Sequence, residues 1–272
     1  MEKIYKAMTI AGSDASGGAG LEADIKTFQE LDVYGMVALT AIVTMKPDDW
    51  AHEVFPIELP IVKKQIETIV AGVGVDAMKT GMLGSAELVE LVADSIDKYS
   101  LHNVVIDPVM VCKGVDDILV PTAAAAIKEL LVKRATVITP NLIEAAYLAG
   151  MKEIKNIADM QEAATRIHEA GAKIVIIKGG DRFNKEQAID LIFEGNEYHT
   201  VALDIIKPAY NHGAGCTYSA AITAMLAKGV APRIAIQTAI AYIRAALEHS
   251  FPLNKFTGPT NHMAWRQHKE KI

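Results

Sequence analysis

The segment from Asn211 to Ala221, NHGAGCTYSAA, holds the residues best suited to chemistry. Gly213 and Gly215 stand directly before a run of small residues that predicts a helix. Backbone N–H groups exposed at such a helix start, together with the helix dipole, stabilise a phosphate or a developing phosphoryl anion. The alternative is a tight turn into a packed helix, in which the glycines serve only close approach of the backbone.

Short apolar runs that predict strands alternate with longer helical patterns. The expected strands cover residues 6–11, 37–44, 75–79, 103–106, 136–139 and 173–177, and helices are expected at 21–31, 60–71, 86–99, 122–132, 157–170, 215–228 and 233–249. This alternation predicts a three-layer α/β fold, in which a mostly parallel central sheet carries helices on both faces. Residues 188–193 and 197–203, separated by Glu-Gly-Asn, predict an antiparallel hairpin at one edge. We find no repeat or linker, so a single domain over residues 1–272 is expected.

Five polar or glycine-rich clusters are associated with these strands: AGSD (11–14), KTGM (79–82), DPVM (107–110), TPNLIE (139–144) and KGGD (178–181). Ligands of open parallel sheets bind outside the carboxyl ends of the strands. We therefore expect the clusters to converge on one rim of the sheet. Turns between strands and helices are often polar without binding anything, so a single cluster would not indicate a site.

Composition excludes some partners and favours a compartment. The chain of 272 residues has a formal net charge of -6, which provides no electrostatic footprint for nucleic acid or an anionic membrane. Its two cysteines, Cys112 and Cys216, form no metal-type pattern and suit a reducing compartment. The first residues, MEKIYKAMTIAGSD, do not form a signal-peptide or membrane-spanning pattern, and we expect a cytoplasmic protein.

The ordered motifs resemble a known family. GAGCT is similar to the anion-hole motif of the ribokinase-like superfamily. The whole chain resembles its hydroxymethylpyrimidine (phosphate) kinases and the pyridoxal kinases derived from them. The matching segments, in order, are AGSDASGGAGLEADIKTFQELDVYGM, KTGML, DPVMVCKG, TPNLIEA, KGGD and HGAGCT. The resemblance implies a ribokinase-like fold, ATP and Mg²⁺ as cofactors, a small-molecule substrate and a homodimer.

The catalytic group implied by the resemblance is Cys216 with the backbone of Gly213, Ala214 and Gly215. The superfamily commonly has an aspartate base where this chain has Cys216, and cysteine there is usual in the hydroxymethylpyrimidine kinase branch. A helix start lowers the pKa of a thiol, so a thiolate near neutral pH is expected, although a buried, inert cysteine is the alternative. Cys112 lies in a glycine-containing segment that reads as a flap, which makes the chain similar to the dual-cysteine pyridoxal kinases. In that subgroup the flap cysteine closes over the site and the other adds to the substrate aldehyde, so the resemblance implies that Cys216 either deprotonates the alcohol or tethers pyridoxal.

Further residues match the substrate pocket of the family. Met45 stands where dedicated hydroxymethylpyrimidine kinases carry glutamine, and methionine packs against an aromatic ring instead of pairing with it. Asp24 matches a carboxylate that contacts the substrate ring, although an acid in a first helical turn needs no ligand. Met82 and Val109 match pocket-lining positions, and both would also suit a plain core.

The nucleotide site implied by the resemblance begins with Asn141 and Glu144. In the family this Asn-x-x-Glu pattern contacts phosphate and organises magnesium through water, and Asp107 could share the metal. The same letters also satisfy an ordinary helix start.

Lysines and glycines near two strand ends complete the expected nucleotide site. Lys178 with Gly179 and Gly180 could offset phosphate charge, and Lys79 is a weaker candidate for the same work. Thr217 could touch a phosphate oxygen or cap its own helix.

These observations favour an ATP-dependent kinase that phosphorylates the 5′-hydroxymethyl group of pyridoxal, and of pyridoxine and pyridoxamine, to give pyridoxal 5′-phosphate from pyridoxal. Two alternatives stay open. One is a hydroxymethylpyrimidine or hydroxymethylpyrimidine phosphate kinase of thiamin biosynthesis, or an enzyme with both activities. The other is a non-catalytic vitamin sensor built on the same fold.

Overall fold

The structure, a computed structural model, describes residues 3–111, 118–180, 182–183, 185–207 and 210–268. The strands are β1 (Lys6–Asp14), β2 (Tyr34–Met45), β3 (His52–Pro56), β4 (Ala77–Thr80), β5 (Val104–Ile106), β6 (Val137–Ile138), β7 (Ile174–Lys178), β8 (Gln187–Glu194) and β9 (Glu197–Asp204). The α-helices are α1 (Gly20–Glu30), α2 (Leu59–Glu67), α3 (Ala86–Lys98), α4 (Pro121–Ala126), α5 (Leu142–Ala149), α6 (Ile157–Glu169), α7 (Ala214–Ala227), α8 (Pro232–Glu248) and α9 (Ala264–Gln267). No helix within these ranges is long and apolar enough to cross a membrane.

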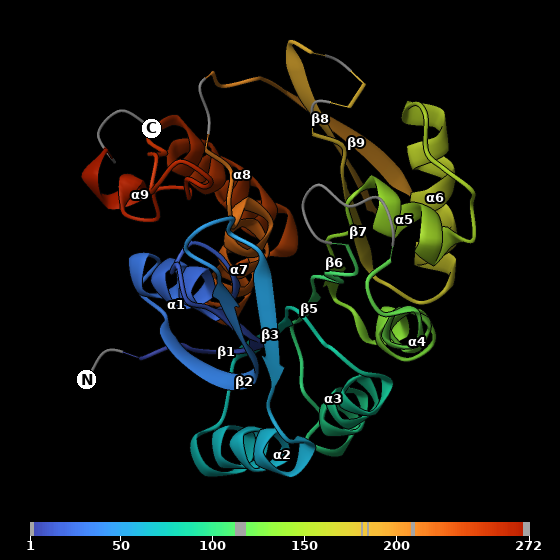
Figure 1. The fold of residues 1–272 in the computed structure, drawn as a ribbon. Coiled ribbons are helices and arrows are strands. Elements are labelled where there is room, and N and C mark those ends of the chain that lie inside the picture. Colours follow the sequence, from blue (N-terminus) through green and yellow to red (C-terminus); the bar gives the residue numbers. More distant parts are fainter. Residues whose placement is uncertain (1–2, 112–117, 181, 184, 208–209, 269–272) are drawn as a thin grey trace.

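The strands of the described residues form one nine-stranded sheet in the order β3-β2-β1-β4-β5-β6-β7-β8-β9 (Figure 1). The strands from β2 to β7 in this order pair in parallel, whereas β3 pairs antiparallel with β2, and β8 and β9 continue antiparallel from β7. The three-layer, mostly parallel fold and the edge hairpin expected from the sequence are therefore confirmed.

Two hydrophobic cores lie on opposite faces of the sheet. Side chains alternate between them along each central strand: Ala7 belongs to one core and Met8 to the other, as do Ala77 and Met78. Helices α2 to α6 cover the face with Met8 and Met78, and α1, α7 and α8 cover the other. Strands buried on both faces read as continuous apolar runs, which is why the sequence indicated them.

The strand order reverses direction at β1. The chain passes from β1 to β2 on one side, and then returns to place β4 on the other side. Such a switch point leaves a crevice at the carboxyl ends of the two strands, where ligands of doubly wound sheets bind. Here Gly12 from β1 and Met82, just after β4, meet: a Cβ added to Gly12 would lie 3.1 Å from Met82 Cε.

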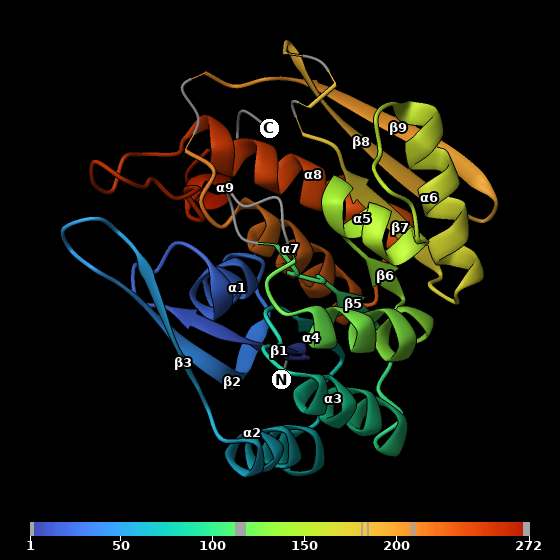
Figure 2. The same cartoon turned by 45° about the vertical axis from the view of Figure 1, so that its right-hand side comes forward.

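Strand β3 and the short helix α9 are elements that the sequence did not predict. All five residues of β3 are exposed, and the strand pairs only with the long strand β2. Since a strand with no buried face has no apolar alternation, its sequence gives no period-two signal. Figure 2 shows the β2–β3 hairpin reaching out from the body of the molecule on the same side as the connection between α8 and α9.

Candidate active site

The turn before α7 has the geometry expected of an anion-binding site. Gly213 caps the helix with a left-handed backbone (φ 77°), and α7 begins at Ala214. A Cβ at position 213 would lie 1.9 Å from the carbonyl oxygen of Gly18, so only glycine fits there. The amide of Ala214 donates to the Asn211 carbonyl at 3.2 Å, whereas the amides of Gly215 and Cys216 make no backbone hydrogen bond to any other described residue and face the position where an anion binds at a helix start.

Lys178 places its ammonium beside this turn. A Cβ built on Gly215 would lie 3.4 Å from Lys178 Nζ, and the same Nζ lies 3.2 Å from Asp107 Oδ1. Burial disfavours the ammonium, but the carboxylates of Asp107 and Glu144 outweigh it and raise the pKa of Lys178. The lysine is therefore charged at neutral pH, next to the backbone donors.

Asp107 is held from two sides at the end of β5. Its side chain is buried, and Ser219 Oγ from α7 donates to Oδ2 at 3.1 Å while Lys178 contacts Oδ1. Helix α7, strand β5 and strand β7 thus meet at one carboxylate. The convergence of the DPVM, KGGD and HGAGCT segments, expected from the sequence, is present in the structure.

Asn141 and Glu144 form a complete capping box at the start of α5. Asn141 Oδ1 accepts the amides of Ile143 (2.9 Å) and Glu144 (3.0 Å), and Glu144 Oε2 accepts the amide of Asn141 (2.9 Å). Glu144 Oε1 accepts the amide of Met110 (3.1 Å). Burial raises the pKa of this carboxyl, and the charge of Lys178 opposes the rise.

The carboxylates of Asp107 and Glu144 suit a magnesium ion that takes most of its ligands from phosphates and water. Both oxygens of Glu144 already accept backbone N–H groups, and no group of three or more His, Cys, Asp or Glu side chains able to hold a metal occurs among the described residues. Magnesium bound with a nucleotide takes most of its ligands from phosphates and water and needs only one or two carboxylates. Asp107 and Glu144 fit that requirement.

Asp24 and Lys79 lie beneath the site, in contact with each other. Lys79 Nζ is 2.8 and 2.9 Å from the two carboxylate oxygens, and Thr9 Oγ1 donates to Asp24 at 2.6 Å. Neither side chain is exposed. The structure therefore places the proposed ring contact and the proposed phosphate contact in one internal ion pair.

The expected low pKa of Cys216 is wrong for this structure. Desolvation raises the pKa of the thiol to about 11, although the ammonium of Lys79 and the amide of Gly20 oppose the rise. The carboxylates of Asp24 and Asp107 add to it. A helix start alone predicted a thiolate, but the buried acids around the thiol were not visible in the sequence. Cys112, the other expected thiol, lies outside the described residues.

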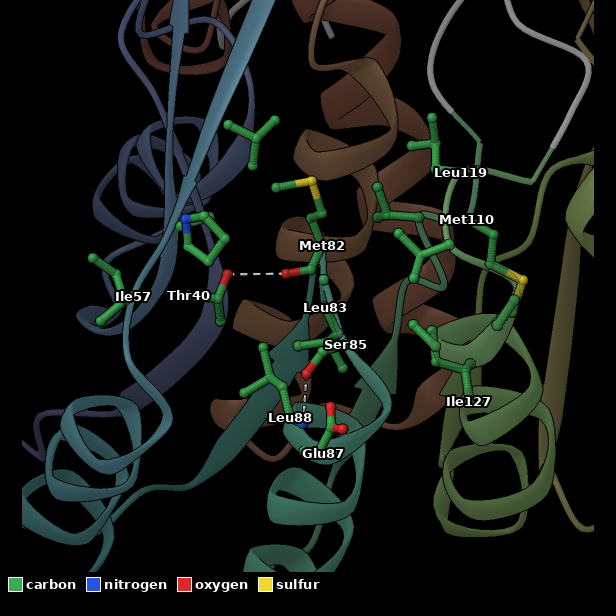
Figure 3. Close-up of a pocket in the computed structure, with 18 of the residues that line it drawn as sticks. Thr40, Ile57, Met82, Leu83, Ser85, Glu87, Leu88, Met110, Leu119 and Ile127 are labelled. Carbon is green, nitrogen blue, oxygen red and sulfur yellow. Dashed lines mark hydrogen bonds between the residues drawn. The ribbon is translucent and has the colours of Figure 1, made fainter.

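A cavity of about 770 Å³ opens beside these groups between the β2–β3 hairpin and the segments after β4 and β5. Figure 3 shows Met82, Leu83, Met110 and Leu119 among its mostly apolar walls, with Thr40 donating to the Met82 carbonyl at 2.9 Å. Val109 also lines it and has φ 41°, an unusual backbone for a β-branched residue. Met82 and Val109 thus border a cavity, and their expected place in a substrate pocket stays a prediction.

Met45 is placed by strand register. It pairs with His52, and Val43 pairs with Val54, across the antiparallel hairpin. Residues directly opposite each other in antiparallel strands project from the same face. Since His52 and Val54 line the cavity, Met45 lies on the cavity side of the hairpin, but it is not itself among the residues that line the cavity.

Thr217 points inward instead of toward the turn. It is fully buried; its hydroxyl donates to the Gly213 carbonyl at 2.9 Å and lies 3.0 Å from His262 Nε2. Gly213 and not Thr217 caps α7, so the capping alternative is wrong; the Thr217 hydroxyl has its partners within the fold instead.

The match to a family model decides what the chain is. Residues 14–261 match the family described as "Phosphomethylpyrimidine kinase". The chain belongs to this family.

Within the family, the chain is similar to proteins of two specificities. It is 52% identical to a pyridoxine kinase from Bacillus subtilis, over 98% of this chain and 99% of the relative. It is 43% identical to a hydroxymethylpyrimidine/phosphomethylpyrimidine kinase from the same organism, over 97% of each chain. A solved pyridoxal kinase from Staphylococcus aureus in complex with AMP-PCP and pyridoxal superposes with a TM-score of 0.92 at 44% identity, covering 98% of this chain and 96% of that one.

One further residue of this phosphomethylpyrimidine kinase family member was missed by the sequence reasoning. Asp190, in the middle of β8, accepts the amide of Gly179 at 3.0 Å and also that of Gly180, and so anchors the KGGD loop from behind. Burial raises the pKa of its carboxyl. The available signal was a lone acid inside the apolar strand QAIDLIFE, because a buried carboxyl needs partners.

Proposed function

We propose that this kinase transfers the γ-phosphoryl group of ATP to the 5′-hydroxymethyl group of pyridoxal, and of pyridoxine and pyridoxamine. The observation that carries the proposal is the Lys178 ammonium standing beside Gly215 of the anion-binding turn, with Asp107 behind it. Phosphoryl transfer of this kind depends on positioning and charge neutralisation more than on covalent help. The similarity to pyridoxine and pyridoxal kinases supports the choice of substrate.

Each group has a defined part in the transfer. The amides of residues 213–216 stabilise the negative charge that develops on the transferring phosphoryl group. Lys178 neutralises the charge of the phosphate chain from the other side. Asn141 and the loop of Gly179 and Gly180 position the nucleotide. Asp107 and Glu144 would hold magnesium, which would screen the charge of the phosphates.

Cys216 acts as a tether for pyridoxal. Desolvation raises the pKa of the Cys216 thiol, and a thiol that keeps its proton at neutral pH is a poor acceptor for the proton of the alcohol, which disfavours the general-base role near pH 7. Addition to the aldehyde forms one C–S bond, and the thiol proton passes to the carbonyl oxygen to give a hemithioacetal without any other reagent. Cys112 is proposed to join the acceptor site from the segment that follows Val111.

The acceptor ring is proposed to lie between the thiol and the cavity. Met82, Val109 and Met45 would contact its faces, and Asp24 would act from below through Lys79 instead of touching the ring. Lys79 and Thr217 would then act on the site through their contacts within the fold, and neither would contact the nucleotide. We further propose that the enzyme is a homodimer and works in the cytoplasm, where a low cysteine content and MgATP suit it.

A mass-spectrometric product assay tests the function. The purified chain is mixed with MgATP and, separately, with pyridoxal, pyridoxine, pyridoxamine and hydroxymethylpyrimidine. A phosphorylated product from pyridoxal, with matching ADP release, is expected. Product from hydroxymethylpyrimidine alone would favour thiamin biosynthesis, to which the 43% identical relative points. A chain that binds pyridoxal but releases no ADP would be a sensor, and the proposal would be wrong.

A further inference from the structure

The two glycine-rich loops of this chain touch each other backbone to backbone, although they are about two hundred residues apart. A Cβ on Gly213 would lie 1.9 Å from the carbonyl oxygen of Gly18, and a Cβ on Gly18 would lie 2.5 Å from His212 Cδ2. The loop of residues 12–20 therefore forms one wall of the anion-binding turn. Small shifts of that loop would move the donors of residues 213–216.

A buried carboxylate holds the two loops together. Asp14 is 7% exposed, and its Oδ2 lies 2.7 Å from His212 Nε2. The same carboxylate accepts the Ser16 amide (2.8 Å), the Ser16 hydroxyl (2.9 Å) and the Ala19 amide (2.8 Å). Burial alone would raise the pKa of Asp14, but hydrogen bonds from His212 and Ser16 hold it well below its usual range.

The first loop also reaches the thiol. The amide of Gly20, at the start of α1, hydrogen-bonds to Cys216. On its other side, His212 is fixed by backbone bonds: its N–H donates to Gly258 at 3.1 Å, and its carbonyl accepts from Thr260 at 3.2 Å. His212 thus links three segments around the reacting groups without itself facing the phosphoryl position.

We infer that Asp14 and His212 are positioning residues, which lock the loop of residues 12–20 onto the anion-binding turn so that the amides of residues 213–216 and the Cys216 thiol keep one geometry. The inference rests on the proposed function for its kinetic consequence only. A displacement of about 1 Å in a catalytic group lowers the rate up to about 100-fold. Loss of the clamp should therefore act on turnover more than on substrate binding.

The test compares His212→Leu with His212→Gln. Leucine removes the donor to Asp14, whereas the amide nitrogen of glutamine reaches the place of Nε2 and can donate in its stead. We expect His212→Leu to lower kcat by about 10- to 100-fold with the KM for pyridoxal changed by less than about threefold, and His212→Gln to restore most of kcat. The matched control is His102→Leu, which changes an exposed histidine between α3 and β5. This variant should behave as wild type.

Two further measurements make the result decisive. Asp14→Asn combined with His212→Leu should lower kcat no more than the stronger single variant, because the two residues act as a unit. Hydrogen exchange of the peptide containing residues 212–217 should accelerate in His212→Leu and not in His102→Leu, whichever substrate the enzyme uses. Unchanged exchange, or a kcat equal to wild type, would overturn the clamp. A wild-type chain that phosphorylates no vitamer would instead overturn the proposed function, and the exchange result would still decide the clamp.

Discussion

The Lys79 ammonium lies 2.8 Å from Oδ1 and 2.9 Å from Oδ2 of Asp24, and neither side chain reaches solvent. The pair sits under Cys216, whose pKa its positive member lowers and its negative member raises. A buried ion pair stabilises little as a unit, but either half alone is costly. The ion pair of Asp24 and Lys79 therefore stabilises the fold beneath the site. Its contribution to stability can be tested separately from catalysis.

Lys79→Met should lower the free energy of unfolding by about 3–5 kcal/mol, because it leaves Asp24 buried without its cation. Urea denaturation followed by circular dichroism measures this change. Asp24→Asn in the Lys79→Met background should recover part of the loss, since the uncompensated carboxylate is gone. Lys63→Met, at an exposed position of α2, is the control. Equal midpoints for Lys79→Met and the control would refute the internal role of the pair.

Lys178→Met should reduce kcat/KM for pyridoxal phosphorylation by about 10²- to 10³-fold, the size of effect found when one preorganised donor is removed from a transition-state charge site. The ammonium stands at Gly215, so the loss should fall mainly on kcat. Steady-state kinetics with MgATP in excess provide the measurement. A variant that kept more than about half of wild-type turnover would show that Lys178 does not face the phosphates.

Cys216 should label slowly near neutral pH. Because desolvation raises its pKa to about 11, its alkylation rate with iodoacetamide should keep rising with pH and reach no plateau below about pH 10. Peptide mass spectrometry of a Cys112→Ser variant follows this thiol alone. A plateau near neutral pH would indicate a thiolate and would restore the base role that the structure disfavours.

The tether role of the same residue has a separate signature. Cys216→Ala should slow pyridoxal turnover more than pyridoxine turnover, because pyridoxine has no aldehyde to form a hemithioacetal. The ratio of the two kcat/KM values is the measurement. Equal losses for both vitamers would leave the thiol without a substrate-specific part.

Acid should weaken the fold through His262 between about pH 6.5 and pH 4. Burial lowers the pKa of His262 from 6.5 to about 4, with a smaller contribution from the charge of Lys26. Between these values the unfolded chain binds a proton that the folded chain does not. The contribution of His262 to the free energy of unfolding is therefore fully present above about pH 6.5, and it falls by about 3 kcal/mol as the pH drops to about 4.

Urea midpoints measured from neutral pH to about pH 4 test this linkage. His262→Gln keeps a polar partner for the Thr217 hydroxyl but cannot titrate, so its curve should be flatter over that window. His102→Gln changes an exposed histidine and should retain the wild-type slope. Parallel curves for wild type and His262→Gln would contradict the assignment.

Met45→Gln should shift preference toward hydroxymethylpyrimidine. The methionine lies on the cavity side of the hairpin and offers no hydrogen bond, whereas a glutamine amide can pair with an aminopyrimidine edge. One added hydrogen bond corresponds to a change of about tenfold in the ratio of kcat/KM values. Ile42→Gln, on the opposite face of β2, is the matched control. An unchanged ratio would place Met45 outside the acceptor site.

The sequence alone determined the layers, the order of the main elements and the rim where the motifs gather. Buried parallel strands are apolar on both faces, glycine and asparagine mark helix starts, and the carboxyl ends of parallel strands must share one edge; each of these is a local signal. TPNLIE and KGGD could therefore be assigned to one rim before any contact was known, and HGAGCT was added to them by its glycine-rich helix start and by the family resemblance. The hairpin of β8 and β9 was found for the same reason, through its Glu-Gly-Asn turn.

Tertiary structure alone decided how the charges are shared. That Lys79 pairs with Asp24, that Lys178 faces Gly215 and Asp107, and that Asp14 holds His212 depend on contacts between segments far apart in the chain. The pKa of Cys216 shows the reason most clearly: a helix start lowers it, but the desolvation imposed by the surrounding fold is larger and raises it. Desolvation and charge pairing are properties of a packed volume, and a linear pattern of residues does not encode them locally.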